Sequence, residues 1–243
     1  MCYLSDANRQ MNLPKEGIQQ AEEASNIFER LGDPVNQARY SIYLARSLCD
    51  DEQLDAVEEA ASHAIALLPE EGEHFLVSQS HHILGEIYRS KGNTEKAIHH
   101  FEVALGIASS LNWHIPLFWI HFSLGQLFFE EGRLDDARVH VEHAKSHAVD
   151  NPYNLARASL LQARFLYRRH MFEEAKSEAL RALEVSEKLG VTDDVECTRK
   201  LFGKMVLDLV THDESAGDGE LLEIVTLFVC INSSCLDWVT KPE

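Results

Sequence analysis

The chain has 243 residues and a formal net charge of −18, from 22 Lys or Arg and 40 Asp or Glu. This acidic balance excludes a general nucleic-acid binder, because phosphate contacts draw their affinity from clustered Lys and Arg. Apolar residues make up 45% of the sequence, which is too much for a disordered acidic chain and enough for a sizeable core.

The predicted elements are helices that recur in repeats of about 40 residues along the chain. Going from the N-terminus, the expected organisation is a half repeat at 1–33, full repeats at 34–73, 74–113, 114–152 and 153–192, and a partial repeat at 193–211. Residues 212–220 read as a linker, and residues 221–243 form a segment that diverges from the pattern.

The repeat is clearest between the second and third full repeats. At a shift of 40 residues, Gly85 falls on Gly125 and Ala97 falls on Ala137, and five further columns agree without a gap. Small residues let two helix axes approach to about 8 Å, while larger apolar columns fill the remaining space. These columns therefore mark where the helices contact one another.

Each full repeat contains two stretches in which apolar residues fall at helical spacing. Glycines such as Gly92 and Gly132 lie between the stretches, where a left-handed residue ends the first helix. The pattern predicts an all-α fold, a right-handed α-solenoid of antiparallel helix pairs.

One repeat carries a family resemblance. Its landmarks are Leu84-Gly85, Tyr88, Ala97, Phe101 and Ala104. Their order and spacing resemble the tetratricopeptide repeat, although the repeat here is longer than the usual ~34 residues. The resemblance covers roughly residues 1–211 and implies a protein-protein interaction module, a scaffold or sensor region.

A narrower resemblance links the stretch from Leu68 to Leu105 to the tetratricopeptide tails of basidiomycete proteins whose front half is a NACHT or NB-ARC signalling ATPase. The sequence contains no G-x-x-x-x-G-K-[ST] loop, so nucleotide binding does not carry over from these proteins. No cofactor is expected.

Stacked helix pairs coil into a superhelix whose first helices line a concave groove suited to a peptide. The face of each first helix opposite the small-residue columns supplies 25 candidate groove positions, of which eight are basic and four acidic. The residues expected to bind the peptide are Arg39, Arg46, His82, Arg89, Trp119, Phe122, Gln126, Phe129, Arg157, Arg164, Tyr167, Arg168, Lys200 and Lys204. Aromatic and Arg side chains dominate binding hot spots, and Arg makes forked bonds to carboxylates. The pattern favours an acidic peptide or protein ligand with apolar anchors.

Two alternatives stay open. The arginines could pair with acidic neighbours and the aromatic residues could pack between adjacent repeats, in which case the face is only structural. A different function is structural self-assembly through the apolar segment at 221–231 and the open ends of the array; the same segment could instead be a helix that caps the last repeat.

Several histidines lie at helical spacing on the predicted second helices: His140, His143 and His147 on one, and His63, His99 and His100 on earlier ones. Two such imidazoles can bind zinc or nickel, but a structural zinc site has four ligands and a catalytic one has three. No H-E-x-x-H motif occurs, and we interpret the stripe as a solvated face rather than a metal site. Because the sequence also lacks a G-x-S-x-G elbow, no enzymatic activity is expected.

The five cysteines include no C-x-x-C pair, which is typical of reduced thiols inside the cell. The N-terminal residues lack a basic stretch followed by an apolar one, so no secretory signal is expected. The longest apolar run is shorter than the roughly 20 residues that a membrane span needs. We therefore expect a cytoplasmic protein with no membrane partner.

Overall fold

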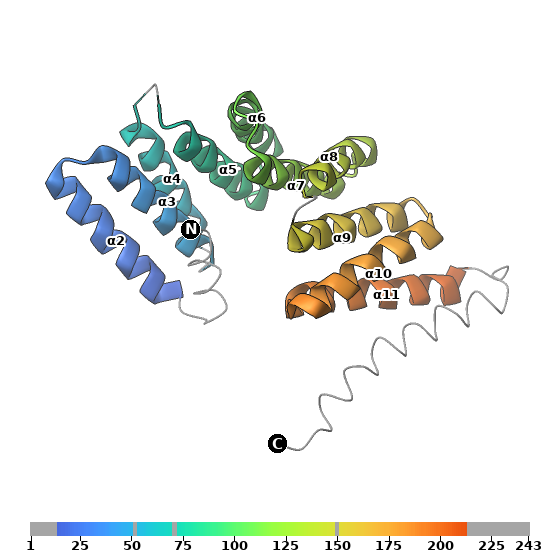
Figure 1. Ribbon diagram of the computed structural model, residues 1–243. Helices are drawn as coiled ribbons and strands as arrows, with labels where there is room; N and C mark the ends of the chain where they lie inside the picture. The colour runs from blue at the N-terminus through green and yellow to red at the C-terminus, as the bar shows by residue number, and fades with distance from the viewer. Residues whose placement is uncertain (1–13, 51–52, 70–71, 149–150, 213–243) are drawn as a thin grey trace, which may run out of the picture. The chain divides into compact units, whose positions relative to one another are not determined.

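Figure 1 shows the computed structural model, which describes residues 14–50, 53–69, 72–148 and 151–212. Within these ranges the helices are α2 (Pro14–Leu31), α3 (Pro34–Asp50), α4 (Leu54–Leu67), α5 (His74–Ser90), α6 (Thr94–Ser110), α7 (His114–Glu130), α8 (Leu134–His147), α9 (Pro152–Arg168), α10 (Phe172–Leu189) and α11 (Thr192–His212). The described part of the chain contains no strand. The predicted all-α fold is confirmed.

The chain divides into two compact parts, Met1–Leu127 and Phe128–Glu243. In the N-terminal part, consecutive helices from α2 to α6 pack on one another, and α3 also contacts α5. In the C-terminal part, consecutive helices from α8 to α11 do the same, and α9 also contacts α11. In both parts, therefore, the first helices of successive pairs lie against each other.

The first helices of the expected repeats begin at Pro34, His74, His114, Pro152 and Thr192. Each start lies at the expected beginning of its repeat or one residue before it, while the division of the whole chain into domains stays a prediction. Helix α11 includes His212, the first residue of the expected linker. The rest of that linker and the divergent segment 221–243 lie outside the described residues.

The turns between helices have a simple chemical origin. Gly92 and Gly132 follow first helices and adopt positive φ angles of 71° and 74°, a conformation that costs glycine little. Asn93 then caps α6 by accepting a hydrogen bond from a backbone N–H, and Asn151 caps α9 in the same way. Pro152 opens α9, where its missing N–H costs nothing. These short turns make successive helices antiparallel.

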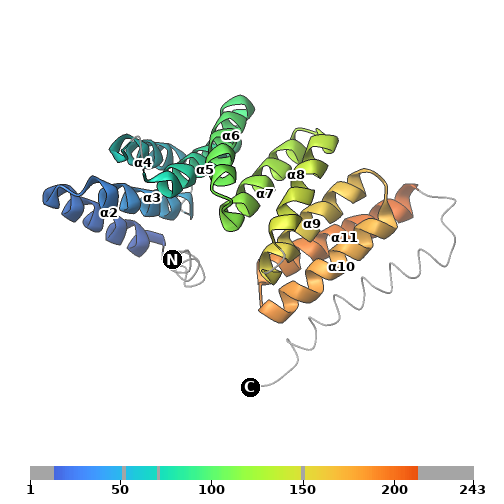
Figure 2. The same cartoon turned by 45° about the horizontal axis from the view of Figure 1, so that its top comes forward.

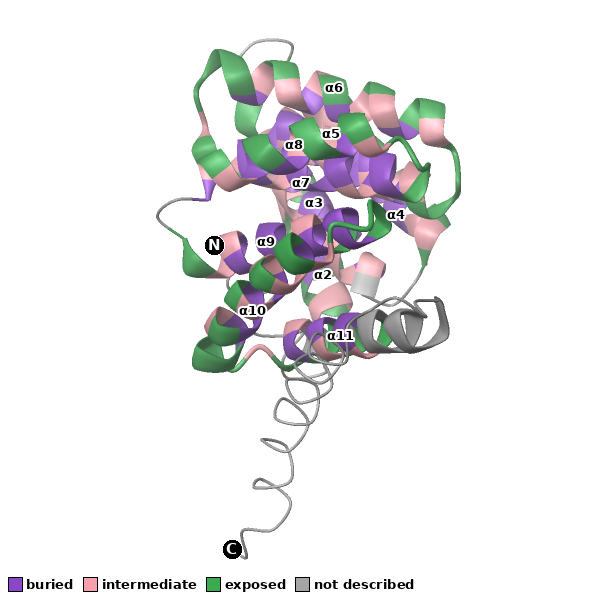
Figure 3. Ribbon diagram, turned by 90° about the vertical axis from the view of Figure 1, so that its right-hand side faces the viewer, coloured by how far each residue is buried: buried purple, intermediate pink, exposed green. Residues whose placement is uncertain are grey.

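The small-residue columns form the contacts between helices, as the spacing predicts. The clearest case is Gly85 on α5, where an added Cβ would lie 2.5 Å from the ring of Phe101 on α6. Phe101 is fully buried, as are Ala97 and Ala104 on the same helix. In Figure 3, α9 is largely buried, whereas α6 and α10 carry exposed residues along much of their length.

Candidate interaction surface

The candidate groove residues fall on the first helices of both parts of the chain. In the N-terminal part they are Arg39 and Arg46 on α3, His82 and Arg89 on α5, and Trp119, Phe122 and Gln126 on α7. In the C-terminal part they are Phe129 at the end of α7, Arg157, Arg164, Tyr167 and Arg168 on α9, and Lys200 and Lys204 on α11. The two sets differ in the groups that contact their charged side chains.

The N-terminal face, defined as Arg46, His82, Glu86, Arg89 and Ser123, is a polar network of partly buried or buried side chains. Glu86 accepts a hydrogen bond from Nη2 of Arg89 at 2.8 Å, one helical turn further along α5. Nε2 of His82 lies 3.0 Å from Oγ of Ser123 on α7. The charge of Arg89 is therefore paired within the chain, although the other carboxylate oxygen of Glu86, Oε1, is buried without a hydrogen-bond partner among the described residues.

Burial and neighbouring charges set the protonation states of this face. Burial lowers the pKa of His82, and the positive charges of Arg46 and Arg89 act in the same direction, against the opposing charge of Glu86. Burial by itself would raise the pKa of Glu86, but Arg89 and His82 outweigh it, so this pKa is lowered. At neutral pH the face holds a neutral imidazole and a carboxylate paired with Arg89.

The aromatic residues of α7 pack on one another. The Trp119 ring lies edge-on to Phe118 at 4.9 Å and to Phe122 at 6.1 Å. Phe122 is buried, with 5% of its surface exposed, whereas Trp119 is only partly buried. Of the expected aromatic anchors in the N-terminal part, Trp119 keeps the larger accessible surface.

The arginine face of the C-terminal part, defined as Arg157, Arg164 and Arg168 on one side of α9, is built differently. The guanidinium groups of Arg164 and Arg168 lie over the Phe129 ring, 5.0 Å and 4.3 Å from its centroid. Arg168 also donates to the backbone carbonyl of Phe129 at 3.3 Å, and Arg157 donates to the Tyr153 hydroxyl at 3.1 Å. Aromatic rings hold these cations in place.

Both Arg164 and Arg168 are exposed to solvent. No carboxylate lies within ion-pair distance of either guanidinium among residues 14–50, 53–69, 72–148 and 151–212. Cation–π contact holds an exposed Arg weakly, by about 0.5–1 kcal/mol, and leaves its N–H donors available. This pair can therefore bind an acidic group without breaking an existing salt bridge.

The remaining candidates of the C-terminal part are less available for binding a peptide. Phe129 and Tyr167 are 5% and 9% exposed, so both rings serve mainly to pack the chain. Lys200 is exposed and pairs with Glu196 at 2.6 Å, and Lys204 is exposed. The structure thus brings the basic candidates of α9 onto one face, while the use of the full set as a peptide site stays a prediction.

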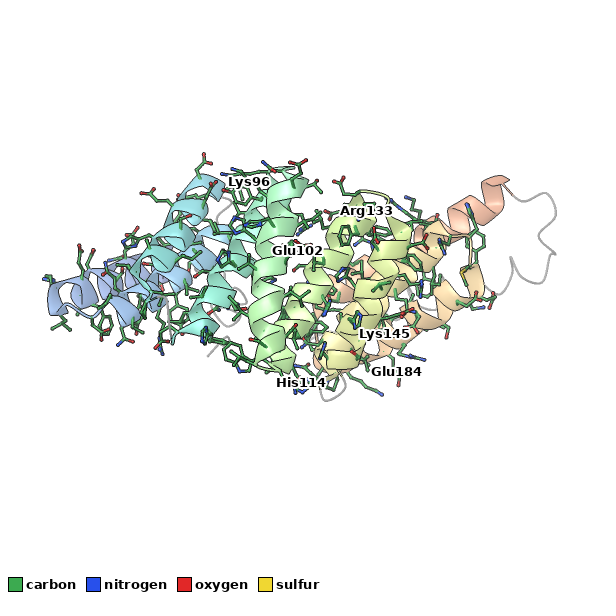
Figure 4. The ribbon with its side chains drawn as sticks, turned by 90° about the horizontal axis from the view of Figure 1, so that it is seen from above. Lys96, Glu102, His114, Arg133, Lys145 and Glu184 are labelled. Carbon is green, nitrogen blue, oxygen red and sulfur yellow. The ribbon has the colours of Figure 1, made fainter. Side chains whose placement is uncertain are left out.

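Charged side chains on the second helices and in the turns that precede them form ion pairs and hydrogen bonds with nearby residues. Figure 4 labels several of them, including Arg133, Lys145 and Glu184. Arg133 pairs with Asp136 at 2.6 Å and Glu184 with Lys188 at 2.7 Å. Nζ of Lys145 donates to Gln162 on α9 and to Glu178 on α10, at 2.6 Å and 2.9 Å. Exposed pairs of this kind add little stability, but Lys145 ties three helices together.

A pair of histidines connects α5 to α6, and one of them, His100, belongs to the stripe interpreted from the sequence as solvated. Nδ1 of His81 lies 2.9 Å from Nδ1 of His100, and the Tyr88 ring stacks on His100. The Tyr88 hydroxyl donates to Glu58 on α4 at 2.6 Å. Burial, followed by the charges of His100 and His99, lowers the pKa of His81 to about 4. The pair therefore shares a hydrogen bond between neutral rings at pH 7.

The interpretation of the histidine stripe as solvated is wrong for His100, which is partly buried beside Tyr88, and for His140. The His140 ring is partly buried against Phe128, with the two centroids 5.3 Å apart. Burial, with a smaller effect of His143, lowers the pKa of His140. Across the described ranges, no group of three or more His, Cys, Asp or Glu is arranged to hold a metal ion. Nor does any described helix combine the length and apolar character that a bilayer crossing requires.

Stacked antiparallel helix pairs with small-residue contacts define the class of helical-repeat proteins. Within this class, residues 78–110 match the family model of the tetratricopeptide repeat, from the middle of α5 to the end of α6. The chain therefore contains a tetratricopeptide repeat, as its motif residues indicated. No curated protein matches the sequence.

Solved structures show the same fold. BtubC (BKLC) from P. vanneervenii is 17% identical, with 95% of both chains covered and a TM-score of 0.72. The apo form of RapI is 14% identical, with 97% of this chain and 84% of that chain covered and a TM-score of 0.70. The TPR-like repeats of a putative kinesin light chain from Podosopora anserina are 16% identical, with 77% and 93% covered and a TM-score of 0.57. Such low identities establish the fold alone.

Proposed function

We propose that this chain is a protein-protein interaction module that binds an acidic peptide or protein segment on the arginine face of its C-terminal part. The observation that carries the proposal is the state of Arg164 and Arg168, which are exposed, held over the Phe129 ring and not paired with a described carboxylate. The tetratricopeptide repeat and the helical-repeat fold support a binding role in general. A cytoplasmic setting and a role beside a signalling ATPase rest on the sequence alone.

Two guanidinium groups held over one ring suit a carboxylate ligand. Arg presents planar N–H donors that match a carboxylate in a two-point contact, and such charge-assisted bonds are about twice as strong as neutral ones. Because the ring already restricts both side chains, less rotamer entropy is lost when the ligand binds. Lys204 lies on α11, which packs against α9, and adds a further exposed positive charge to this part of the chain.

A peptide panel tests the proposal. Fluorescent peptides of equal length, with net charge graded from strongly acidic to strongly basic, are titrated with the full chain and followed by anisotropy. Affinity should rise with negative charge and fall as salt is added, because the contacts are ionic. Arg164→Glu/Arg168→Glu should weaken binding of the acidic members at least about tenfold, which corresponds to 1.4 kcal/mol.

The matched control makes the same change in charge on a second helix of the same part. Arg181→Glu/Lys188→Glu alters two exposed cations of α10 that pair with Glu178 and Glu184. This control should bind the acidic peptides almost as well as the wild type. Equal losses in both double variants would show that only the overall charge matters, and the proposed site would be wrong.

Self-association is a second candidate, because the described α2 exposes apolar surface. Ile27 and Leu31, one helical turn apart, are 45% and 70% exposed. Exposed apolar patches often mark contacts between proteins. Light scattering on the wild type and on Ile27→Asp/Leu31→Asp distinguishes the cases: a dimer that the variant abolishes supports self-association, and a monomer in both rejects it.

A further inference from the structure

We propose that residues 213–223 of this chain bind its own arginine face and compete there with the external acidic ligand. This inference rests on the proposed function, since it assigns a second, internal occupant to the same site. The segment lies outside the described residues and follows directly on the end of α11 at His212.

The chemistry of the segment is that of the expected ligand. Its sequence, DESAGDGELLE, contains five carboxylates and no Lys or Arg. The apolar run that begins at Leu221 adds side chains of the kind that anchor a peptide on a protein surface. Opposite it, Arg164 and Arg168 are exposed cations without a described carboxylate partner. The two sequences are therefore complementary in charge.

The topology of the C-terminal part places the segment at the correct end of α9. The turns 169–171 and 190–191 are short, so α10 is antiparallel to both α9 and α11, and α9 and α11 run in the same direction. Figures 1 and 2 both show the end of α11 at the same end of this helix stack as the turn between α9 and α10. Arg164 and Arg168 occupy the last two turns of α9, which end at that turn.

The distances involved are short compared with the length of the segment. Helices rise about 1.5 Å per residue, so Arg168 is about 24 Å from the start of α9, and α11 passes that level about one helical turn before it ends. Packed helices lie about 8–10 Å apart. The segment 213–223 spans up to about 36 Å when it is fully extended, at 3.3 Å per residue. The segment that follows α11 can therefore reach both arginines.

A tethered ligand has a large advantage over a free one. A short flexible connection gives an effective concentration in the millimolar range, so even weak contacts would keep the face occupied most of the time. A second copy of the chain would need protein concentrations of the same order to compete. For this reason we assign the internal segment, and not a second copy, as the occupant.

The test measures whether the segment blocks its own site. A fluorescein-labelled peptide with the sequence of residues 213–223 is titrated with the full-length wild type and with a full-length tail variant. The tail variant neutralises the five carboxylates by the changes Asp213→Asn, Glu214→Gln, Asp218→Asn, Glu220→Gln and Glu223→Gln. The labelled peptide should bind the tail variant at least about tenfold more tightly than the wild type.

A matched control removes the same number of charges elsewhere. It carries Glu142→Gln, Glu173→Gln, Glu174→Gln, Glu184→Gln and Glu187→Gln, all exposed on α8 and α10. If the control gains as much affinity as the tail variant, the gain reflects total charge and the inference is overturned. Adding Arg164→Gln/Arg168→Gln to the tail variant should remove the gain, and a gain that persists would place the segment on another surface.

The outcomes also separate this inference from the proposed function. Equal binding of the labelled peptide by wild type and tail variant, lost in Arg164→Glu/Arg168→Glu, leaves the acidic site standing and overturns the internal occupant. No binding of any acidic peptide by any variant overturns both. A difference between wild type and tail variant that grows with protein concentration would identify a second copy as the occupant, and would overturn the intramolecular assignment.

Discussion

On the N-terminal face, Arg89 forms an ion pair with Glu86 at 2.8 Å, and both side chains are partly buried. On the arginine face, Arg164 and Arg168 lie over an aromatic ring and remain exposed. All three arginines were expected in one groove from the same helical pattern. Their surroundings differ because α5 supplies a carboxylate one turn before Arg89, whereas α9 carries no acidic residue between Pro152 and Arg168.

The comparison shows how one position in a repeat can serve either folding or binding. An Arg that already has a carboxylate must give it up to bind another, and the desolvated carboxylate left behind is costly. An Arg on an aromatic ring keeps most of its N–H donors free, since the ring uses only the face of the guanidinium group; Arg168 uses one donor on the Phe129 carbonyl. The arginine face is therefore the better candidate for ligand binding.

Charge reversal should separate the two faces most strongly. Arg89→Glu places two partly buried carboxylates together on α5 and should cost about 2–4 kcal/mol of unfolding free energy, somewhat less than for a fully buried pair. Arg164→Glu should cost less than about 1 kcal/mol, because only an exposed cation–π contact is lost. Urea unfolding of the two variants measures this difference. Similar losses for both would contradict the distinction between the faces.

The two parts also differ in how their small columns are packed. Gly85 lies against the large ring of Phe101, whereas the aligned positions in the C-terminal part are Ala163 and Ala179. Gly85→Leu should therefore overpack the contact and cost about 1–3 kcal/mol. Gly106→Ala on the outer side of α6 meets nothing within 4 Å and should gain up to about 1 kcal/mol from helix propensity. Thermal denaturation of the pair tests the packing, and a neutral Gly85→Leu would refute it.

Acid should destabilise the N-terminal part through its histidine pair. The pKa of His81 is about 4 in the folded chain, against an ordinary value of 6.5, so the unfolded chain takes up the proton first as the pH falls. Above pH 6.5, His81 is neutral in both states and does not reduce the free energy of unfolding. Between pH 6.5 and 4 the unfolded state is favoured by protonation, and the free energy of unfolding falls by about 1–2 kcal/mol at pH 5. His81→Gln should reduce the drop in Tm between pH 7 and pH 5, while the exposed His74→Gln should not. An unchanged drop in His81→Gln would contradict the role of the pair.

The smallest expected effect concerns the ring beneath the arginines. Phe129→Leu keeps an apolar side chain at a buried position but removes the cation–π contacts of Arg164 and Arg168. Peptide affinity should fall about two- to fivefold, the equivalent of about 0.5–1 kcal/mol. Fluorescence anisotropy with the acidic peptides measures the affinity of the variant. The titration is done at a temperature at which circular dichroism shows that the variant is folded. Unchanged affinity would show that the ring does not position the arginines.

Much of the fold follows from local sequence rules. The positive φ angles of Gly92 and Gly132, and the buried contact of Gly85, arise from residues whose spacing alone marked turns and helix contacts. Helix starts at Pro34 and Pro152 are equally local, because proline fits the first turn of a helix. Such features depend only on neighbours in the same or the adjacent helix, which one sequence contains.

The candidate site was harder to predict, because it depends on which residues of different helices meet. The pattern placed Phe122, Phe129 and Tyr167 on the first-helix face, but it could not show that packing buries them. The Glu86–Arg89 pair carried a visible signal, since an acid and a base three residues apart on a helix commonly meet. The contact between His81 and His100 spans two helices, and helical periodicity gives no information on it.

The central claim is that an acidic ligand binds the arginine face and not the N-terminal face. Photo-crosslinking measures this directly: an acidic peptide from the panel, carrying benzoylphenylalanine at its centre, is irradiated with the full chain and the crosslinked residues are mapped by mass spectrometry. The account predicts crosslinks in α9, around Arg164 and Arg168, and in the facing side of α11, which Arg164→Glu/Arg168→Glu removes. Crosslinks concentrated on α5 around Arg89, or on the second helices α8 and α10, would contradict it.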